Sequence, residues 1–136
     1  MFKEGAIKTQ TMAQDLFHGE KVLAFDLETT GVSTNNDRIV QYALIGTLAD
    51  GTSVNVEQIV KPSIRIPIDA SNIHGITNDD VRGKPPLSSV ADELAELIDG
   101  AILVGHNVRN FDFQMLKTEF LRICLLYTSP SPRDPT

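Results

Sequence analysis

AFDLETTG, residues Ala24–Gly31, completes the apolar run Lys21–Leu27, which is short, bounded by turn residues and predicts a buried strand. Two acids one residue apart, Asp26 and Glu28, interrupt this apolar pattern. Because residues i and i+2 of a strand point to the same face, the two carboxylates repel each other and lose hydration. A divalent cation would neutralise them, and oxygen ligands suit Mg²⁺ or Mn²⁺. Taken alone, the pair also fits a strand end whose acids reach solvent.

Two more strands are predicted after this one, at Ile39–Leu48 and Thr52–Val60. Asp50 and Gly51 lie between them and indicate a hairpin, because glycine supplies the positive φ of a tight turn. The first three strands are therefore expected to form a meander.

The second half of the chain alternates helix and strand. Ser88–Gly100 predicts an amphipathic helix that ends at its glycine, with Ser89 and Asp92 as a capping box. Ala101–Asn107 predicts a fourth strand, and Arg109–Ile123 predicts a second long helix. The apolar face of that helix is expected to carry Phe113, Leu116, Phe120 and Ile123. The order β-β-β-α-β-α indicates an α/β domain with a mixed sheet.

Composition narrows the functional classes. The 136 residues fit one domain at most, on a prior of ~100–200 residues per domain. The net charge of −6 argues against phosphate binding by a broad basic face, but it allows a nucleic-acid enzyme whose positive charge comes from metal ions. No apolar run approaches the ~18 residues of a membrane span, and residues 1–20 lack the features of a signal peptide. We therefore expect a cytoplasmic protein without a membrane partner.

The C-terminal residues break the pattern. Cys124–Thr136 is rich in serine and proline, and back-translation of CLLYTSPSPRD matches the transposon-end adapter of tagmentation sequencing libraries. We therefore expect an N-terminal extension at 1–20, a partial catalytic domain at 21–123 and a non-native tail at 124–136. The alternative for the tail is a disordered terminus.

A second acidic position lies in GHNVRNFDFQML, residues Gly105–Leu116. Asp112 is predicted in the first turn of the last helix, where the helix dipole alone would favour a carboxylate. Because it follows a strand and a loop, it is also expected across from Asp26 and Glu28. Three such ligands can hold one metal ion and help to hold a second, and two metals about 3.5–4 Å apart stabilise an in-line phosphoryl displacement.

These motifs together identify a family resemblance. DLETTG, GHNVRNFDFQML and the intervening IHGIT (Ile73–Thr77) resemble the DEDD exonuclease superfamily, above all its DnaQ-like branch, which includes the proofreading subunit of bacterial replicative DNA polymerase. The resemblance spans Val22 to Ile123. It implies an RNase H-like fold with flanking helices, here incomplete at the C-terminus, and a two-metal 3′→5′ exonuclease that releases nucleoside monophosphates.

The resemblance also implies residue roles. Asp26, Glu28 and Asp112 match the catalytic metal ligands for two Mg²⁺ or Mn²⁺ ions. The positions that match contacts to the terminal nucleotide are Thr29, Ile73, His74, Asn107 and Phe111. For His74 a local structural role stays open, as does a core role for Phe111. His106 is expected to fix its loop, and Thr30 to form a turn.

The family's third motif is absent from the sequence. It would supply a fourth carboxylate and a His or Tyr general base, yet no histidine follows His106, and the only aspartate after Asp112 is Asp134. The chain is therefore expected to have little activity by itself. The expected substrate is a DNA 3′ end, reached with a DNA polymerase or helicase as partner or fused domain. An RNA exonuclease and a non-catalytic nucleic-acid- or protein-binding module remain the alternatives.

Overall fold

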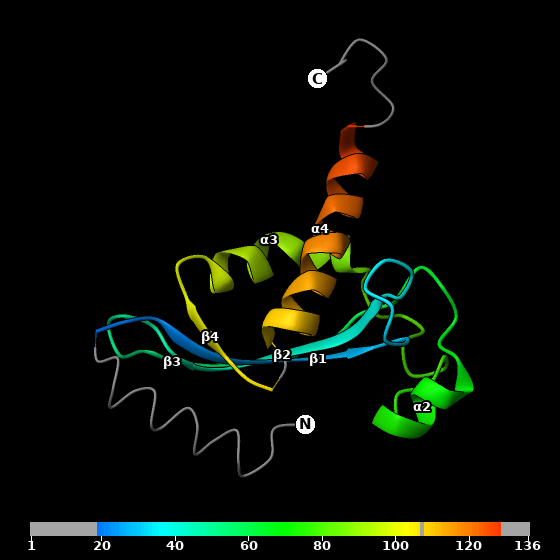
Figure 1. Cartoon of the computed structure of the whole chain (residues 1–136), viewed down its shortest axis with the longest axis horizontal. Helices are drawn as coiled ribbons and strands as arrows, with labels where there is room; N and C mark the ends of the chain where they lie inside the picture. The colour runs from blue at the N-terminus through cyan, green and yellow to red at the C-terminus, as the bar shows by residue number, and fades with distance from the viewer. Residues whose placement is uncertain (1–18, 107, 129–136) are drawn as a thin grey trace.

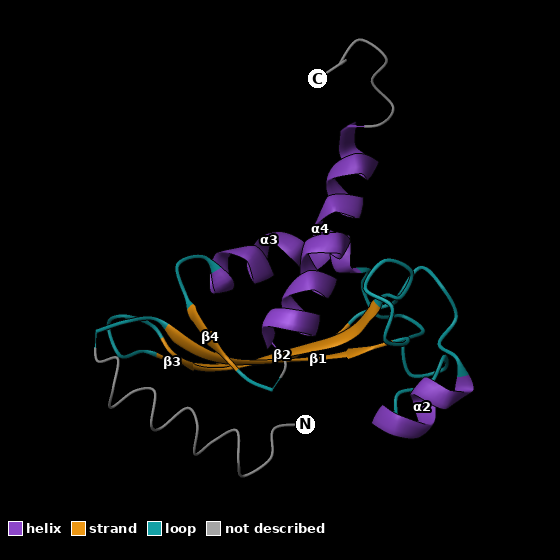
Figure 2. Cartoon of the chain, in the orientation of Figure 1, coloured by secondary structure: helices purple, strands orange, loops and turns teal. Residues whose placement is uncertain are grey.

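The computed structural model describes residues 19–106 and 108–128. A mixed four-stranded sheet in the order β3-β2-β1-β4 lies beneath two long helices, as Figures 1 and 2 show. In chain order the elements are β1 (Val22–Thr29), β2 (Ile39–Thr47), β3 (Ser53–Ile59), α2 (Ile68–His74), α3 (Leu87–Ile98), β4 (Ile102–Val104), the π-helical turn η1 (Val108–Asp112) and α4 (Phe113–Thr128). The α/β class and the mixed sheet predicted from the sequence are confirmed.

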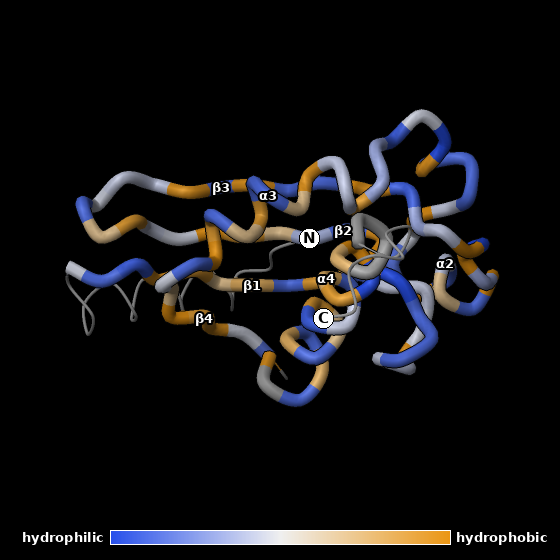
Figure 3. Tube along the Cα trace, turned by 90° about the horizontal axis from the view of Figure 1, so that it is seen from above, coloured by the Kyte–Doolittle hydropathy of each residue, from blue (hydrophilic) through white to orange (hydrophobic). Residues whose placement is uncertain are grey.

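The predicted meander is also present. β2 pairs antiparallel with both β1 and β3, and Figure 3 shows the strands side by side. Gly51 forms the turn between β2 and β3 with a φ of 88°, and the Thr52 N–H donates to the Asp50 carboxylate at 2.9 Å. β4 then returns parallel to β1 but pairs only with the first three residues of that strand, Val22–Ala24. Among the described residues, the rest of β1 therefore has no strand partner on this side.

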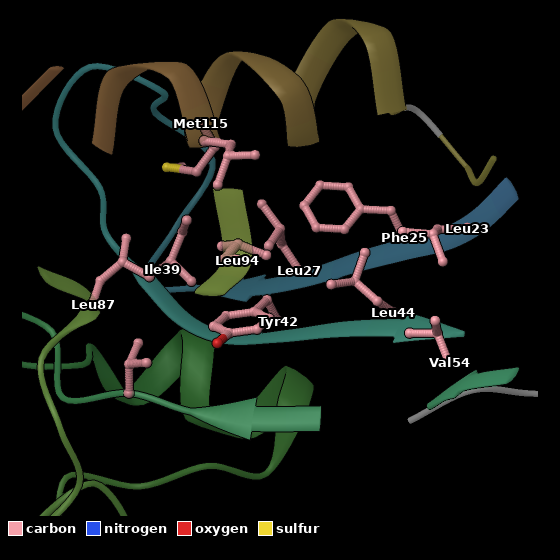
Figure 4. Close-up of a cluster of buried hydrophobic side chains, with 12 residues drawn as sticks. Leu23, Phe25, Leu27, Ile39, Tyr42, Leu44, Val54, Leu87, Leu94 and Met115 are labelled. Atoms are coloured by element: carbon pink, nitrogen blue, oxygen red, sulfur yellow. The ribbon is translucent and has the colours of Figure 1, made fainter. Parts of the chain in front are cut away.

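The core lies between the sheet and the two long helices. Alternate residues of β1, namely Leu23, Phe25 and Leu27, point toward α3 and α4 (Figure 4). Buried residues of the other elements complete this cluster: Ile39, Tyr42, Leu44, Val54, Val60, Leu87, Leu94, Met115 and Leu116. The alternation leaves Asp26 and Glu28 on the opposite side of β1, as the period of a strand requires.

A smaller core fastens α2 to the end of the sheet. Ala70 of α2 packs with a cluster of aliphatic side chains that surround Val40 of β2, namely Ile66, Ile76 and Val81. Figures 1 and 3 place α2 beyond the ends of β1 and β2, away from α3 and α4. The helix therefore stands beside the acidic end of β1.

The structure corrects two details of the helices. The capping box predicted at Ser89 and Asp92 is wrong, because α3 begins earlier, after Pro86, and has no side-chain cap. Proline fits this position because a helix start leaves its N–H groups without partners anyway. Phe113 was expected on the apolar face of the last helix, but its side chain is 47% exposed.

The exposure of Phe113 follows from where the buried stripe of the last helix lies. A π-helical turn, Val108–Asp112, precedes α4 and places Asp112 on the same buried stripe as Met115, Leu116 and Glu119. Residues three, four and seven positions apart share one face of a helix, so the neighbouring phenylalanine points elsewhere. α4 also continues to Thr128, beyond the end predicted at Ile123. Within the described residues, no helix is both long and apolar enough to cross a membrane.

Candidate active site

The candidate site begins at the second half of β1. Asp26 and Glu28 are half-buried on the side of β1 that points away from the core, while Phe25 and Leu27 between them are buried. The pairing of β1 with β2 shifts register between Glu28 and Thr29, which marks a bulge at the end of the strand. Such irregularities re-aim side chains at the end of a strand.

The chain brings Asp112 to this edge by a short route around β1. β4 ends at Val104, and the backbone then passes so close to β1 that a Cβ added at Gly105 would lie 2.6 Å from the carbonyl oxygen of Phe25. Only glycine allows this approach. The turn η1, which begins at Val108, also contacts β1. Figure 1 shows this path from β4 into α4.

The carboxyl group of Asp112 is affected by both acids of β1. Its residue is 5% exposed, and burial raises the pKa of Asp112 to about 7, with the negative charges of Asp26 and Glu28 as the next causes. A buried carboxyl beside two carboxylates favours its protonated form unless a cation offsets the repulsion. The structure thus brings the three predicted metal ligands into electrostatic contact.

The donor set has the chemistry of a hard divalent cation. Three carboxylates supply only oxygen ligands, which suit Mg²⁺ or Mn²⁺. Among residues 19–106 and 108–128, however, no three His, Cys, Asp or Glu side chains are close enough together to coordinate an ion as they stand. A bound cation would favour the charged form of all three carboxylates, because an opposite charge nearby stabilises a carboxylate. The residues therefore fit a divalent cation in kind, and binding would require them to close around it.

A pocket of about 450 Å³ opens beside Glu28. Its lining unites four of the predicted nucleotide-contacting residues: Thr29, Ile73, His74 and Phe111. Phe111 also packs against the main core, so its side chain serves both the core and the pocket wall. The side chain of Ile73 is 85% exposed, which leaves an apolar surface available to a flat ligand. Apolar walls beside charged groups are typical of a small-molecule site.

His74 has a defined structural role in this pocket. Its Nδ1 accepts a hydrogen bond from the Ile76 N–H at 3.1 Å, so Nε2 carries the proton and donates to the carbonyl oxygen of Thr29, also at 3.1 Å. The ring therefore ties the end of α2 to the end of β1. The local structural role left open by the sequence and the position at the pocket both hold.

The remaining predicted residues are placed as follows. Thr30 is buried and donates to the Asp37 carboxylate at 2.8 Å, in agreement with a turn-forming role. His106 is exposed. Asn107 lies outside the described residues.

Several residues of the pocket were not predicted from the sequence. Val32, Pro67 and Asp69 line it together with the residues already named. Val32 follows AFDLETTG directly and is exposed, so an apolar residue in an otherwise polar loop was the available signal. No local pattern distinguishes Pro67 and Asp69, because only the packing of α2 brings them to β1.

The sequence is similar to those of known exonucleases. Residues 23–134 match the family RNase_T, described as exonuclease. The chain is 35% identical over 101 residues to DNA polymerase III subunit epsilon of Treponema pallidum (strain Nichols), covering 74% of this chain and 46% of the relative. It is 32% identical over 101 residues to the 3′-5′ exonuclease DinG of Bacillus subtilis (strain 168), covering 74% of this chain and 11% of the relative. The chain thus spans less than half the length of both relatives.

Solved structures are similar as well. E. coli exonuclease I in complex with a dT13 oligonucleotide superposes with a TM-score of 0.66 at 25% identity, covering 76% of this chain and 24% of that one. A product-bound structure of exonuclease I gives the same TM-score and identity, with 76% and 26% covered. Exonuclease I has an RNase H-like fold, and the predicted RNase H-like fold is therefore confirmed for this chain.

Proposed function

The chain belongs to the exonuclease family RNase_T and to its DEDD, DnaQ-like branch, and from this premise we propose that it forms the metal- and nucleotide-binding part of a 3′→5′ exonuclease acting on DNA. Family members of this fold use divalent metal ions. The proposal assigns metal binding to Asp26, Glu28 and Asp112, and nucleotide binding to the adjacent pocket.

One observation carries this proposal. The carboxyl of Asp112 lies within electrostatic reach of Asp26 and Glu28, and Glu28 also lines the pocket. Metal ligands and a nucleotide-sized pocket therefore share one residue. A phosphodiester whose terminal nucleoside occupies the pocket would have its phosphate next to the three carboxylates.

Each group of residues in the site is proposed to have a distinct role. The exposed Ile73 and the half-buried Phe111 offer apolar surface to the terminal base and sugar. His74 fixes the carbonyl of Thr29, so that the backbone at the end of β1 keeps one position against the ligand. Two divalent ions held by Asp26, Glu28 and Asp112 would stabilise the charges on the attacking and leaving oxygens.

The relatives support DNA as the substrate. A subunit of DNA polymerase III and a 3′-5′ exonuclease are among them, and exonuclease I was solved with a dT13 oligonucleotide. By analogy we propose a DNA 3′ end as the substrate and a polymerase or helicase assembly as the partner, with proofreading or end-trimming as the role. A net charge of −6 fits a domain that a partner delivers to DNA.

The chain by itself is proposed to hydrolyse DNA slowly. Its sequence contains no histidine after His106, and α4 carries no second acid near Asp112 other than Glu119, which is engaged elsewhere. A water molecule at the site would therefore lack a general base, whose contribution is about 10²–10⁴-fold. Metal and nucleotide binding do not require that base.

Metal-dependent stabilisation tests the proposal. The test is thermal unfolding at about pH 7.5, near physiological pH. Mn²⁺ should raise the melting temperature of the 136-residue chain. Asp26→Asn should remove this rise, whereas Asp79→Asn, an exposed acid of a surface ion pair, should retain it. If Mn²⁺ leaves the melting temperature unchanged in both the wild-type chain and the Asp26→Asn variant, the result would instead favour a non-catalytic binding module.

A further inference from the structure

Glu119 is a buried acid that the proposed chemistry does not use. It lies two helical turns after Asp112 on the same stripe of α4 and is 7% exposed. Its Oε2 accepts a hydrogen bond from the backbone N–H of Ile39 at 2.9 Å, and its Oε1 accepts from Arg122 at 2.7 Å. Ile39 pairs with Thr29 where the β1–β2 register shifts, so the bond supports the irregular end of β1.

Arg122 extends this contact to the loop between β1 and β2. Its guanidinium donates to the carbonyl oxygen of Asp37 at 3.2 Å and to that of Asn35. An arginine can join a buried carboxylate to two backbone carbonyls because its planar guanidinium presents several N–H donors in a fixed fork. The pair Glu119–Arg122 therefore links α4, the helix that follows Asp112, to residues far away in the sequence.

The same loop forms one wall of the pocket. Gly31, Val32 and Asp37 all line it. The Asp37 carboxylate accepts from the Thr30 hydroxyl at 2.8 Å and from the Ser33 N–H at 2.9 Å, which closes the loop on itself. A Cβ at Gly31 would meet that carboxylate at 2.5 Å, so the loop is closely packed.

We propose that Glu119 and Arg122 are positioning residues, which set the pocket wall of the β1–β2 loop against α4, the helix that directly follows Asp112. Neither side chain touches the pocket, so each acts through the loop and through Ile39. The inference rests on the proposed function, because it gives the loop a role in holding the terminal nucleotide.

Substitutions at this pair, with a matched surface pair as control, test the inference. Arg82 and Asp79 form an ion pair of the same i, i+3 spacing, but both side chains are largely exposed. The variants are Glu119→Gln, Arg122→Gln, Arg122→Lys and the control Arg82→Gln. For each 136-residue chain we would measure the melting temperature, amide hydrogen exchange at Ser33, Asp37 and Ile39, and the Kd for thymidine 5′-monophosphate with Mn²⁺.

Positioning predicts a defined set of results. Glu119→Gln and Arg122→Gln should speed amide exchange in the loop and weaken nucleotide binding about five- to tenfold, in line with the usual size of indirect coupling. Arg122→Lys keeps the charge but not the fork, so it should restore part of the affinity. Arg82→Gln should change neither quantity.

Two opposite results remain distinguishable. If the glutamine variants melt at lower temperature but bind the nucleotide within about twofold of the wild-type chain, the pair is merely structural and the inference is wrong. If the wild-type chain itself binds no thymidine 5′-monophosphate, the proposed function fails. Amide hydrogen exchange in the β1–β2 loop then still tests the role of Glu119 and Arg122. Unchanged exchange in Arg122→Gln would overturn the inference independently.

Discussion

The imidazole of His74 donates from Nε2 to the carbonyl oxygen of Thr29 at 3.1 Å, across 45 residues of sequence. The bond joins the last residue of α2 to the last residue of β1. Its second nitrogen is held by the Ile76 N–H, so the ring has one orientation and one donor direction. His74 therefore adds a polar tie between the end of β1 and α2 to the apolar contacts of the smaller core around Val40.

Replacement of His74 by alanine should weaken both stability and binding. Loss of two hydrogen bonds leaves the Thr29 carbonyl without its α2 partner, and a typical intramolecular hydrogen bond contributes about 1 kcal/mol. We expect a drop of roughly 1–2 kcal/mol in the free energy of unfolding, measured by urea titration. Affinity for thymidine 5′-monophosphate should also fall. His106→Ala is the control, because that histidine is exposed, and an equal loss in both variants would contradict the role of His74.

Ile73 should affect binding without affecting stability. Its side chain is 85% exposed and lines the pocket, whereas Ile68 on the same helix is 75% exposed and lies outside the pocket. Ile73→Ser should reduce nucleotide affinity about fivefold, because roughly 1 kcal/mol of apolar contact is lost. Ile68→Ser should leave the affinity unchanged. Calorimetric titration with the nucleotide and Mn²⁺ measures both, and similar losses in the two variants would contradict the assignment.

Without metal, Asp112 should make the protein less stable as the pH rises. Its pKa is raised from 3.8 to about 7, so the folded chain holds the proton more tightly than the unfolded chain. The stabilisation is fully present below the unfolded pKa and is lost as the pH rises through about 7. Asp112→Asn should therefore make the unfolding free energy decline less steeply between about pH 5 and pH 8, a range that includes the folded-state pKa.

The same substitution has opposite effects with metal. With a chelator present, Asp112→Asn should raise the unfolding free energy at pH 8 by about 1–2 kcal/mol, since solvent screens part of the full shift. With Mn²⁺ present it should remove the metal-dependent stabilisation. Urea unfolding at about pH 5 and pH 8, with chelator and with Mn²⁺, measures these changes in unfolding free energy. An equal pH slope in the variant and the wild type would show that another group causes the decline.

Substitution of Gly105 should destabilise the protein because this residue lies very close to the backbone of β1. An added Cβ would lie 2.6 Å from the Phe25 carbonyl oxygen and 2.8 Å from the Val108 side chain. Gly105→Ala should cost about 1–3 kcal/mol of unfolding free energy and weaken stabilisation by Mn²⁺, because η1 must move. Gly83→Ala is the control: its φ is +82°, but nothing surrounds it, so its cost of about 1 kcal/mol should leave the metal effect intact. Equal metal effects in both variants would rule out this account.

Local patterns made part of the site predictable. Strand periodicity placed Asp26 and Glu28 on one face, and the turn at Gly51 placed β3 beside β2. Asp112 was expected in the first turn of the last helix, but it ends a π-helical turn that precedes α4. Phe113 was misplaced because the buried stripe of the helix runs through Met115, Leu116 and Glu119, and Phe113 lies off that stripe.

The sequence by itself determined the elements whose stability is local: the strand pattern, the hairpin turn and the apolar face of α3. Only the tertiary structure decided which distant groups meet. The close approach at Gly105, the bond from His74 to Thr29 and the bond from Ile39 to the buried Glu119 each join segments more than 40 residues apart. Such contacts depend on how the layers pack, because a long-range contact leaves no periodic signal in either of the segments that it joins.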